Sequence, residues 1–460
     1  MSARRSGDVA RSTRNRNKVP DALLEARRRR EGRAKTGREK ASQRPGVKKT
    51  ADGKSAYKAL EGGLSSRGHA ILAVTLIMFL YGMVMIFSAS SGLAFEVHGS
   101  SYYYLLRQAV WFGVGLVALV AMVYMDYHRV VRVSPLIVLV SLAALAAVPF
   151  VGTEAYGSKR AIAFGPVVFQ PSELAKMALV IYAAYMYGKR GRKPESWRDI
   201  FLPVMLVTVL ACILILIEPD LGSMIIAGIS VFAVLYLSGA PLSRLALLGG
   251  TGLGLTALFI VTSSYRKARF LAFLDPWSAP REGGFHIIQS MVALGSGSVS
   301  GLGLGMSRQK FFYLPNAHTD FIFSIIGEEV GLIGTLAVLA LFTIFIYLGF
   351  KVARGAPDGM GRLVAGGITC MIGIQALVNM GAATGVIPIT GVTLPFFSYG
   401  GSSLVISMCL AGILINVSRS EEKQERNKDR RKERESGDMR GRHGRPPPSP
   451  SSSRRGFKVA

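Results

Sequence analysis

Long apolar segments separated by short polar connections run from about residue 70 to residue 417. Many of these segments approach the roughly 20 residues that an α-helix needs to cross the hydrocarbon core of a bilayer. The pattern therefore predicts an all-α polytopic membrane protein with about ten transmembrane helices. The predicted helices are 70–91, 105–125, 133–151, 166–188, 200–217, 219–238, 242–262, 321–350, 363–385 and 399–417.

One connection is much longer than the others: residues 263–320, between the seventh and eighth predicted helices. Both ends of the chain are highly charged and poor in apolar residues, a composition that cannot bury enough surface to fold alone. We therefore expect a basic disordered tail at 1–69, a ten-helix membrane domain at 70–417 and a charged disordered tail at 418–460. The first apolar segment begins near Ala70, so we expect no cleavable secretory signal.

Composition agrees with this division, because half of the 460 residues are hydrophobic and the formal net charge of +27 is concentrated in the tails. Residues 1–69 carry 20 Lys and Arg against 7 Asp and Glu, and residues 418–460 carry 14 against 7. We interpret the tails as solvated arms that help to fix topology, with contact to anionic lipid or nucleic acid as the alternative. Three cysteines without paired spacing indicate neither a disulfide nor a metal site.

The distribution of basic residues predicts the orientation. With ten helices both termini share one side, and the short connections on that side hold 11 Lys and Arg. The short connections on the other side hold two, or three if Arg107 is included. The positive-inside rule therefore places both tails in the cytoplasm and residues 263–320 outside. This outer segment carries six cations, which either coat a solvated loop or bind an anionic ligand: Arg266, Lys267, Arg269, Arg281, Arg308 and Lys310.

Ionisable residues near the ends of several predicted helices gather at one membrane depth on the outer side: Glu173, Lys176, Glu218, Asp220, Asp320 and Glu328. Charged groups in membrane spans are costly and usually functional, so a shared polar cavity is one interpretation. The alternatives are local. Glu173 and Lys176 could neutralise each other as an i, i+3 pair, Glu218 and Asp220 could cap a turn, and Asp320 could cap the helix that follows it.

Two glycine-rich segments and one histidine have similar alternatives. GLGLG at 301–305 has no surrounding strand and crossover, so we interpret it as a flexible re-entrant or interfacial loop rather than a nucleotide-binding motif. PITGVTLPFFSYGGSS at 388–403 could present backbone N–H groups to a phosphate or make a tight membrane re-entry. We interpret His318 as a loop residue rather than a metal ligand or base. The chain has no Walker motif, which disfavours ATP-driven transport.

Four segments together resemble the SEDS family (shape, elongation, division and sporulation), FtsW type, over nearly all of residues 70–417. They are GSKRAIAFGPVVFQPSELAK, EPDLGS, LDPWSAPREGGFHIIQSMVALGSGSVSGLGLGMSRQKFFYLPNAHTDFIFSIIGEEVG and GVTLPFFSYGGSS. The DPW and GLGMSRQKFFYLP segments look closer to the FtsW division branch than to the RodA elongation branch. The chain departs from the family pattern at Lys159 and Ala161–Ala163, which replace a more usual Arg and RWI-like core, and at Asn316, where Glu is common.

The resemblance implies a peptidoglycan glycosyltransferase that polymerises lipid II, the undecaprenyl-pyrophosphate-linked disaccharide pentapeptide, outside the cytoplasmic membrane at the division septum. It also implies a class B penicillin-binding protein as transpeptidase partner, together with other divisome membrane proteins, and we expect no nucleic acid partner. A divalent cation, Mg²⁺ or Mn²⁺, is the candidate cofactor, without assigned ligands, and we expect no organic cofactor.

The family's essential loop aspartate falls on Asp320. We expect Asp320 to be the general base, because joining two sugars requires deprotonation of an acceptor hydroxyl. We expect cations to offset the charge on the leaving pyrophosphate. The predicted substrate-binding residues are Glu173, Lys176, Lys159, Arg160, Asp220, Arg308, Gln309, Lys310 and Ser402.

The competing functions are a lipid II flippase and a divisome scaffold. A transporter should show internal repeats and polar residues that continue to the cytoplasmic side, and the sequence shows neither clearly. A scaffold leaves the charged residues within the membrane unexplained.

Overall fold

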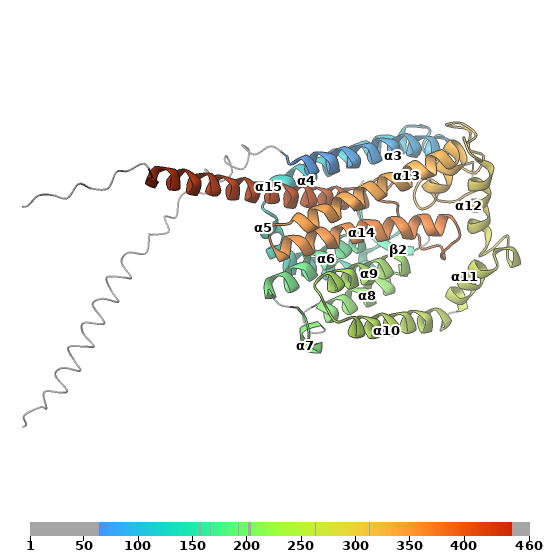
Figure 1. Ribbon diagram of the computed structural model, residues 1–460. Coiled ribbons are helices and arrows are strands. Elements are labelled where there is room, and N and C mark those ends of the chain that lie inside the picture. Colours follow the sequence, from blue (N-terminus) through green and yellow to red (C-terminus); the bar gives the residue numbers. More distant parts are fainter. Residues whose placement is uncertain are drawn as a thin grey trace, which may run out of the picture. The chain divides into compact units, whose positions relative to one another are not determined.

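The computed structural model describes residues 64–443, apart from 156–157, 166, 192, 201–203, 263 and 312. It is mostly helical, and each of the ten predicted segments coincides with a helix (Figure 1). These helices are α3 (Ser66–His98), α4 (Tyr103–Tyr124), α5 (Tyr127–Val151), α6 (Pro171–Arg190), α8 (Leu206–Ile217), α9 (Leu221–Leu237), α10 (Leu242–Val261), α13 (Ile322–Gly355), α14 (Gly359–Ala383) and α15 (Gly401–His443).

Among the residues that the structure describes, seven helices are long and apolar enough to cross a membrane: α3, α4, α5, α10, α13, α14 and the first part of α15. The prediction of a helical, multi-pass membrane protein is therefore confirmed. Of the three other predicted spans, α8 and α9 are shorter apolar helices, and α6 has Glu173 and Lys176 in its first two turns. The number of ten crossings stays a prediction.

The all-α prediction missed a small antiparallel sheet in the connection before α6. Its strands, in spatial order, are β1 (Thr153–Ala155), β2 (Ser158–Phe164) and β3 (Val167–Phe169). Gly165, with φ of 62°, lies between β2 and β3 and adopts a left-handed conformation that favours glycine. Residues 167–169 pair with β2, so α6 begins at Pro171 rather than at the predicted residue 166.

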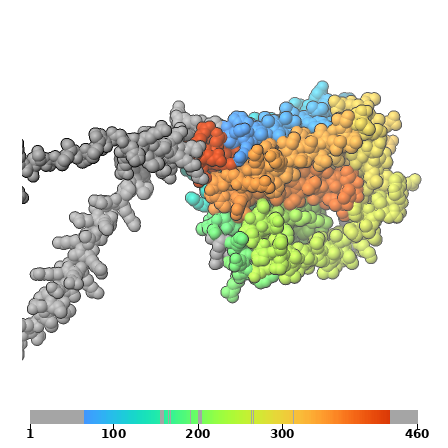
Figure 2. Space-filling model, viewed as in Figure 1, coloured from blue at the N-terminus to red at the C-terminus, as the bar shows by residue number. Residues whose placement is uncertain are grey.

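The long connection at 263–320 is also structured in part. It contains α11 (Ser264–Leu274), the 3₁₀ turn η2 (Pro276–Ser278) and α12 (Phe285–Ser296). Figures 1 and 2 show these segments, in yellow and yellow-green, at one end of the helical domain. The short helix α7 (Trp197–Ile200) lies at the opposite end. The two connections that were predicted to lie on different sides of the membrane are therefore far apart.

Helix α13 is interrupted at Gly331, whose φ of 73° and ψ of −162° are not helical. The backbone of residues 298–303 fills this break and satisfies the peptide groups that the interruption frees, as burial in a membrane protein requires. The donor–acceptor pairs are Leu332–Ser298, Ile333–Val299, Leu302–Glu328 and Gly303–Glu329, at 2.9 to 3.2 Å. The first residues of the GLGLG segment are therefore held by backbone hydrogen bonds to the interrupted helix. This structure is more ordered than the flexible re-entrant or interfacial loop that the sequence predicted.

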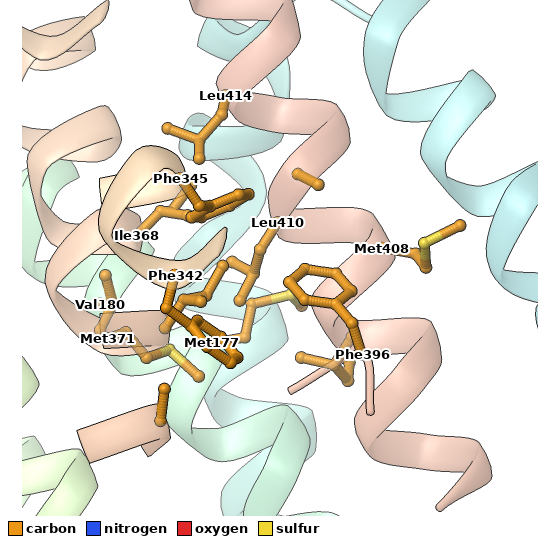
Figure 3. Close-up of a cluster of buried hydrophobic side chains, with 14 of the residues drawn as sticks. Met177, Val180, Phe342, Phe345, Ile368, Met371, Phe396, Met408, Leu410 and Leu414 are labelled. Atoms are coloured by element: carbon orange, nitrogen blue, oxygen red, sulfur yellow. The ribbon is translucent and has the colours of Figure 1, made fainter. Parts of the chain in front are cut away.

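The core of the domain lies where α6, α13, α14 and α15 meet (Figure 3). Phe342 and Phe345 of α13 are buried there, and their rings lie 5.8 Å from those of Phe397 and Phe396 respectively, in the turn before α15. Lipid is as apolar as this core, so close packing rather than burial from water favours the association of the helices. The core therefore holds the turn at 394–400 against α13.

Helix α15 continues past the predicted end at residue 417 to His443, which differs from the disorder predicted for that segment. The continuation is rich in Glu, Lys and Arg, which are good helix formers. Glu421 of this continuation pairs with Arg67 at the start of α3. The rest of the two predicted tails, 1–63 and 444–460, lies outside the described residues.

The predicted orientation can be tested with cysteines at Ser278 and Glu195, both exposed, in a chain whose native cysteines Cys212, Cys370 and Cys409 are replaced. A membrane-impermeant maleimide applied to intact cells should label Ser278→Cys, whereas Glu195→Cys should react only after permeabilisation. This result follows from the bias of basic residues in the connections. The reverse labelling pattern would contradict the orientation.

Candidate functional site

Asp320 lies in a tight turn directly before α13. Asn316 opens this turn with φ of 57°, a left-handed conformation that asparagine tolerates better than most residues. Its carbonyl accepts hydrogen bonds from the backbone N–H groups of Thr319 and Asp320, both at 3.1 Å. The side chain of Asn379, on α14, donates to the carbonyls of Asp320 at 2.8 Å and Val392 at 2.7 Å. The backbone of Asp320 is therefore fixed from two sides.

The side chain of Asp320 does not cap α13. The N-cap position belongs to Phe321, and no side-chain hydrogen bond caps this helix. Within the described part of the chain, no hydrogen bond reaches the Asp320 carboxylate. The capping alternative therefore fails, and the carboxylate is available for another role.

The Asp320 carboxylate lines a cavity of about 100 Å³ whose walls come from distant parts of the chain. The lining residues are Arg160 on β2, Arg269 on α11, His286 on α12, and Asn316, Phe321, Ile389, Thr390 and Gly391. A methyl group on Gly391 would lie 3.4 Å from a terminal nitrogen of Arg160 and 3.6 Å from a carboxylate oxygen of Asp320. Because Gly391 has no side chain, a gap remains beside it that borders both the Arg160 nitrogen and the Asp320 oxygen.

The electrostatics of the cavity suit a base. Burial raises the pKa of Asp320 to about 6, against the opposing effect of the positive charges of Arg160 and Arg269. A carboxyl group with a pKa near neutral can both accept a proton and be ionised at physiological pH. Burial also lowers the pKa of His286, and Arg269 lowers it further, so both effects favour the neutral imidazole. The His286 ring stacks on Phe321 with centroids 6.2 Å apart.

The EPDLGS turn contacts a residue of the cavity, because its Pro219 carbonyl accepts a hydrogen bond from Arg160 at 3.0 Å. The two acids of this turn have different roles. Asp220 is buried and caps α9 by accepting the Ser223 N–H at 3.0 Å. Glu218 is also buried, and neither of its carboxylate oxygens has a hydrogen-bond partner among the described residues. Burial raises the pKa of Glu218 to about 8, and the negative charge of Asp220 raises it too. The capping alternative therefore holds for Asp220, while Glu218 is protonated at neutral pH.

Two of the predicted substrate-binding lysines are buried in ion pairs and do not line the Asp320 cavity. The ammonium group of Lys176 is fully buried and donates to Glu173 at 2.9 Å and to Gln375 at 3.0 Å. That of Lys310 is buried and donates to Glu329 at 3.0 Å. Breaking either pair would leave a buried charge without its partner, at a cost of about 3–5 kcal/mol. The local-neutralisation alternative therefore describes Glu173 and Lys176.

Four other predicted binding residues lie outside the cavity. Lys159 is exposed on β2. Arg308 is exposed, and its backbone N–H donates to the Glu328 carboxylate at 2.8 Å, as does that of Gln309 at 3.4 Å. The hydroxyl of Ser402 donates to a carbonyl of β3 at 3.1 Å. Of the nine predicted binding residues, only Arg160 lines the cavity with Asp320.

Sequence reasoning missed Arg269, His286, Asn316 and Gly391 as site residues. Arg269 had a weak signal, since it was one of six outer cations. Gly391 stood in the 388–403 motif, which was predicted either to bind phosphate through backbone N–H groups or to make a membrane re-entry. His318, by contrast, behaves as predicted for a loop residue. It is buried against Tyr104 and Tyr399, and burial lowers the pKa of His318 to about 4.

The sequence assigned no ligands to the predicted divalent cation. In the part of the chain that the structure describes, no three His, Cys, Asp or Glu side chains converge in a way that could hold a metal ion. Because Mg²⁺ usually takes only one or two protein carboxylates, with substrate phosphates and water as its other ligands, the divalent cation stays a prediction.

A larger cavity of about 810 Å³ lies between the second half of α3 and residues 304–311. Its lining is mostly apolar, with Phe95 and Phe311 at the walls, and Lys310 in it is already paired with Glu329. Its one carboxylate among the lining residues is the exposed Glu96. The carboxylate of Asp320 instead shares its cavity with two arginines, so the smaller cavity is the candidate site.

Known proteins share this architecture. Residues 69–423 match the FtsW/RodA/SpoVE family, described as cell cycle proteins. The chain is 38% identical over 351 residues to stage V sporulation protein E of Bacillus subtilis, which covers 76% of this chain and 96% of that protein. It is 39% identical over 350 residues to a Geobacter sulfurreducens protein named "Probable peptidoglycan glycosyltransferase FtsW", which covers 76% of this chain and 94% of the relative.

Two solved structures are similar in fold and in sequence. One, described as "Structural coordination of polymerization and crosslinking by a peptidoglycan synthase complex", has a TM-score of 0.63 and 30% identity, and covers 76% of this chain and 97% of its own. The other is the rod shape determining protein RodA of Thermus thermophilus, with a TM-score of 0.58 and 29% identity. It covers 76% of this chain and 96% of its own. The chain belongs to the FtsW/RodA/SpoVE family of cell cycle proteins.

Proposed function

We propose that this protein is a peptidoglycan glycosyltransferase that polymerises lipid II into glycan strands, with Asp320 as the general base. The observation that carries the proposal is the position of the Asp320 carboxylate, which caps no helix and lines a cavity with two arginines. The name of the Geobacter relative, which is 39% identical, supports the reaction class.

In the proposed reaction Asp320 takes the proton of the acceptor sugar hydroxyl, as a positioned base typically does. The hydroxyl oxygen forms a bond to the anomeric carbon of the donor. The bond from that carbon to the diphosphate breaks, and the diphosphate leaves with the electron pair. Cationic side chains at the cavity offset the charge that develops on the leaving group.

The proposal includes a setting and a partner. The membrane domain would work at the division septum with both termini in the cytoplasm, so that the cavity faces the outer leaflet. A class B penicillin-binding protein would crosslink the product, together with other divisome proteins. The similar structure described by "polymerization and crosslinking" supports a paired arrangement of the two activities.

The interrupted helix α13 is weak support for the flippase alternative. Discontinuous helices in transporters leave their ends open to a binding site. Here the break at Gly331 is filled by the backbone of residues 298–303.

The direct test of the proposed function is purified protein incubated with lipid II, with and without the transpeptidase partner, with glycan strands resolved by electrophoresis.

Replacing Asp320 by Asn should abolish catalysis without disturbing the fold. The amide keeps the shape but has no usable basicity, so Asp320→Asn should reduce lipid II polymerisation by at least about 100-fold. The matched control is Glu282→Gln, an exposed carboxylate of the same outer segment, which should retain activity. Near-normal polymerisation by a well-folded Asp320→Asn protein would contradict the assignment of the base.

The pH dependence should report the same carboxyl group. Burial raises the pKa of Asp320 to about 6, and a base must be ionised to act. The value of kcat/KM should therefore increase with pH through about 6 and level off above it, with a roughly tenfold loss per unit on the acid side. Initial rates between roughly pH 5 and pH 8 measure this limb, and a flat profile over that range would argue against a titrating base.

A further inference from the structure

The two cations at the Asp320 cavity reach it from separate parts of the fold. Arg160 lies on β2 of the small sheet, and Arg269 lies on α11 of the long outer connection. Both positive charges act on Asp320, since each opposes the effect of burial on the pKa of that carboxyl group. Arg269 is exposed and Arg160 is half-buried, so both can reach a ligand. Lys176 and Lys310 are buried in pairs.

Arg160 is held in a defined orientation. One of its terminal nitrogens donates to the Pro219 carbonyl at 3.0 Å. Its other terminal nitrogen borders the gap left by Gly391, and the Asp320 carboxylate borders the same gap. The Nε of Arg160 is buried and has no hydrogen-bond partner among the described residues. An atom of a ligand in the gap would touch a guanidinium donor and the carboxylate together.

We propose that Arg160 and Arg269 form a clamp for the diphosphate of a lipid-linked donor, with Arg160 binding from the sheet and Arg269 from α11. A guanidinium presents a planar fork of donors that suits phosphate oxygens better than an ammonium does. The clamp deepens the proposed function and rests on it. His286 adds no charge to this clamp, because burial lowers its pKa, as does Arg269.

The clamp fits the charge balance of the reaction. The acceptor proton moves to the Asp320 carboxylate and neutralises it, while the bond to the anomeric carbon breaks and the diphosphate gains a negative charge. The negative charge at the cavity therefore moves from the carboxylate to the leaving group. Two cations that line the same cavity as Asp320 can offset the negative charge at both positions, which is the arrangement that stabilises such a transfer.

Direct binding can be separated from any effect on the base by using the Asp320→Asn protein as the host. In this host no carboxylate at 320 needs the arginines, and no turnover consumes the probe. The probes are undecaprenyl diphosphate, undecaprenyl monophosphate and inorganic pyrophosphate, which distinguish a lipid headgroup from a free anion. The added variants are Arg160→Ala, Arg269→Ala and Arg269→Lys, with Lys267→Ala as the matched control on α11, where Lys267 is exposed.

Each Arg→Ala variant should weaken undecaprenyl diphosphate binding by about tenfold or more, as expected for the loss of a charged hydrogen bond. Arg269→Lys should lose less, and Lys267→Ala should match the host. Pyrophosphate should compete with the lipid in the host, and undecaprenyl monophosphate should bind more weakly. Equal diphosphate affinity in the alanine and control variants, or no diphosphate binding by the monodisperse host, would overturn the clamp.

Lipid II polymerisation by proteins that retain the native Asp320 separates this inference from the proposed function. Arg269→Ala should shift the acid limb of the pH profile to higher pH, because loss of the cation favours the protonated form of Asp320. A wild-type protein that binds diphosphate through both arginines but makes no glycan would retain the clamp and refute the polymerase. Polymerisation with unchanged kinetics and pH profile in both alanine variants would retain the polymerase and refute the clamp.

Discussion

The buried carboxylates of Glu328 and Glu329, at the broken start of α13, hold the outer connection against the membrane domain. Glu328 accepts the hydroxyl of Ser307 and the backbone N–H of Arg308, and Glu329 accepts the ammonium of Lys310 at 3.0 Å. A buried ionised carboxylate is costly unless it is hydrogen-bonded or paired, so displacement of the connection would leave both acids without these partners. The two acids and the break at Gly331 together fix the helix that Asp320 precedes.

The site is then built on turns that the domain holds from several directions. The αL conformation of Asn316 begins the turn before α13, and the Asn379 side chain joins that turn to the loop that contains Gly391. Rigid support of this kind is what a catalytic carboxylate needs, because a base acts only when its distance to the proton is controlled. The turn at the start of α13 therefore orients the Asp320 side chain toward the cavity.

The charged residues of the domain fall into two groups with different consequences. Lys176 and Lys310 neutralise buried carboxylates and contribute to structure. Arg160 and Arg269 line a cavity with Asp320. Cations of the same charge therefore have different roles at the two kinds of position. Exposure to the cavity, rather than residue type, decides which cations can contact a substrate.

The sequence by itself determined the helical membrane domain, because apolar segments of bilayer length have few alternative structures, and it indicated Asp320 as the candidate base through a specific resemblance. It did not determine the sheet at 153–169, whose strands are short. It offered Glu173 as the partner of Lys176 only as one alternative, and it gave no partner for Lys310, which pairs with an acid 19 residues away. Only the tertiary structure brought Arg269 and Gly391 to Asp320. That contact joins segments roughly 50 to 70 residues away on either side of the acid, and local patterns carry no information about such distant neighbours, since packing of the whole domain sets them.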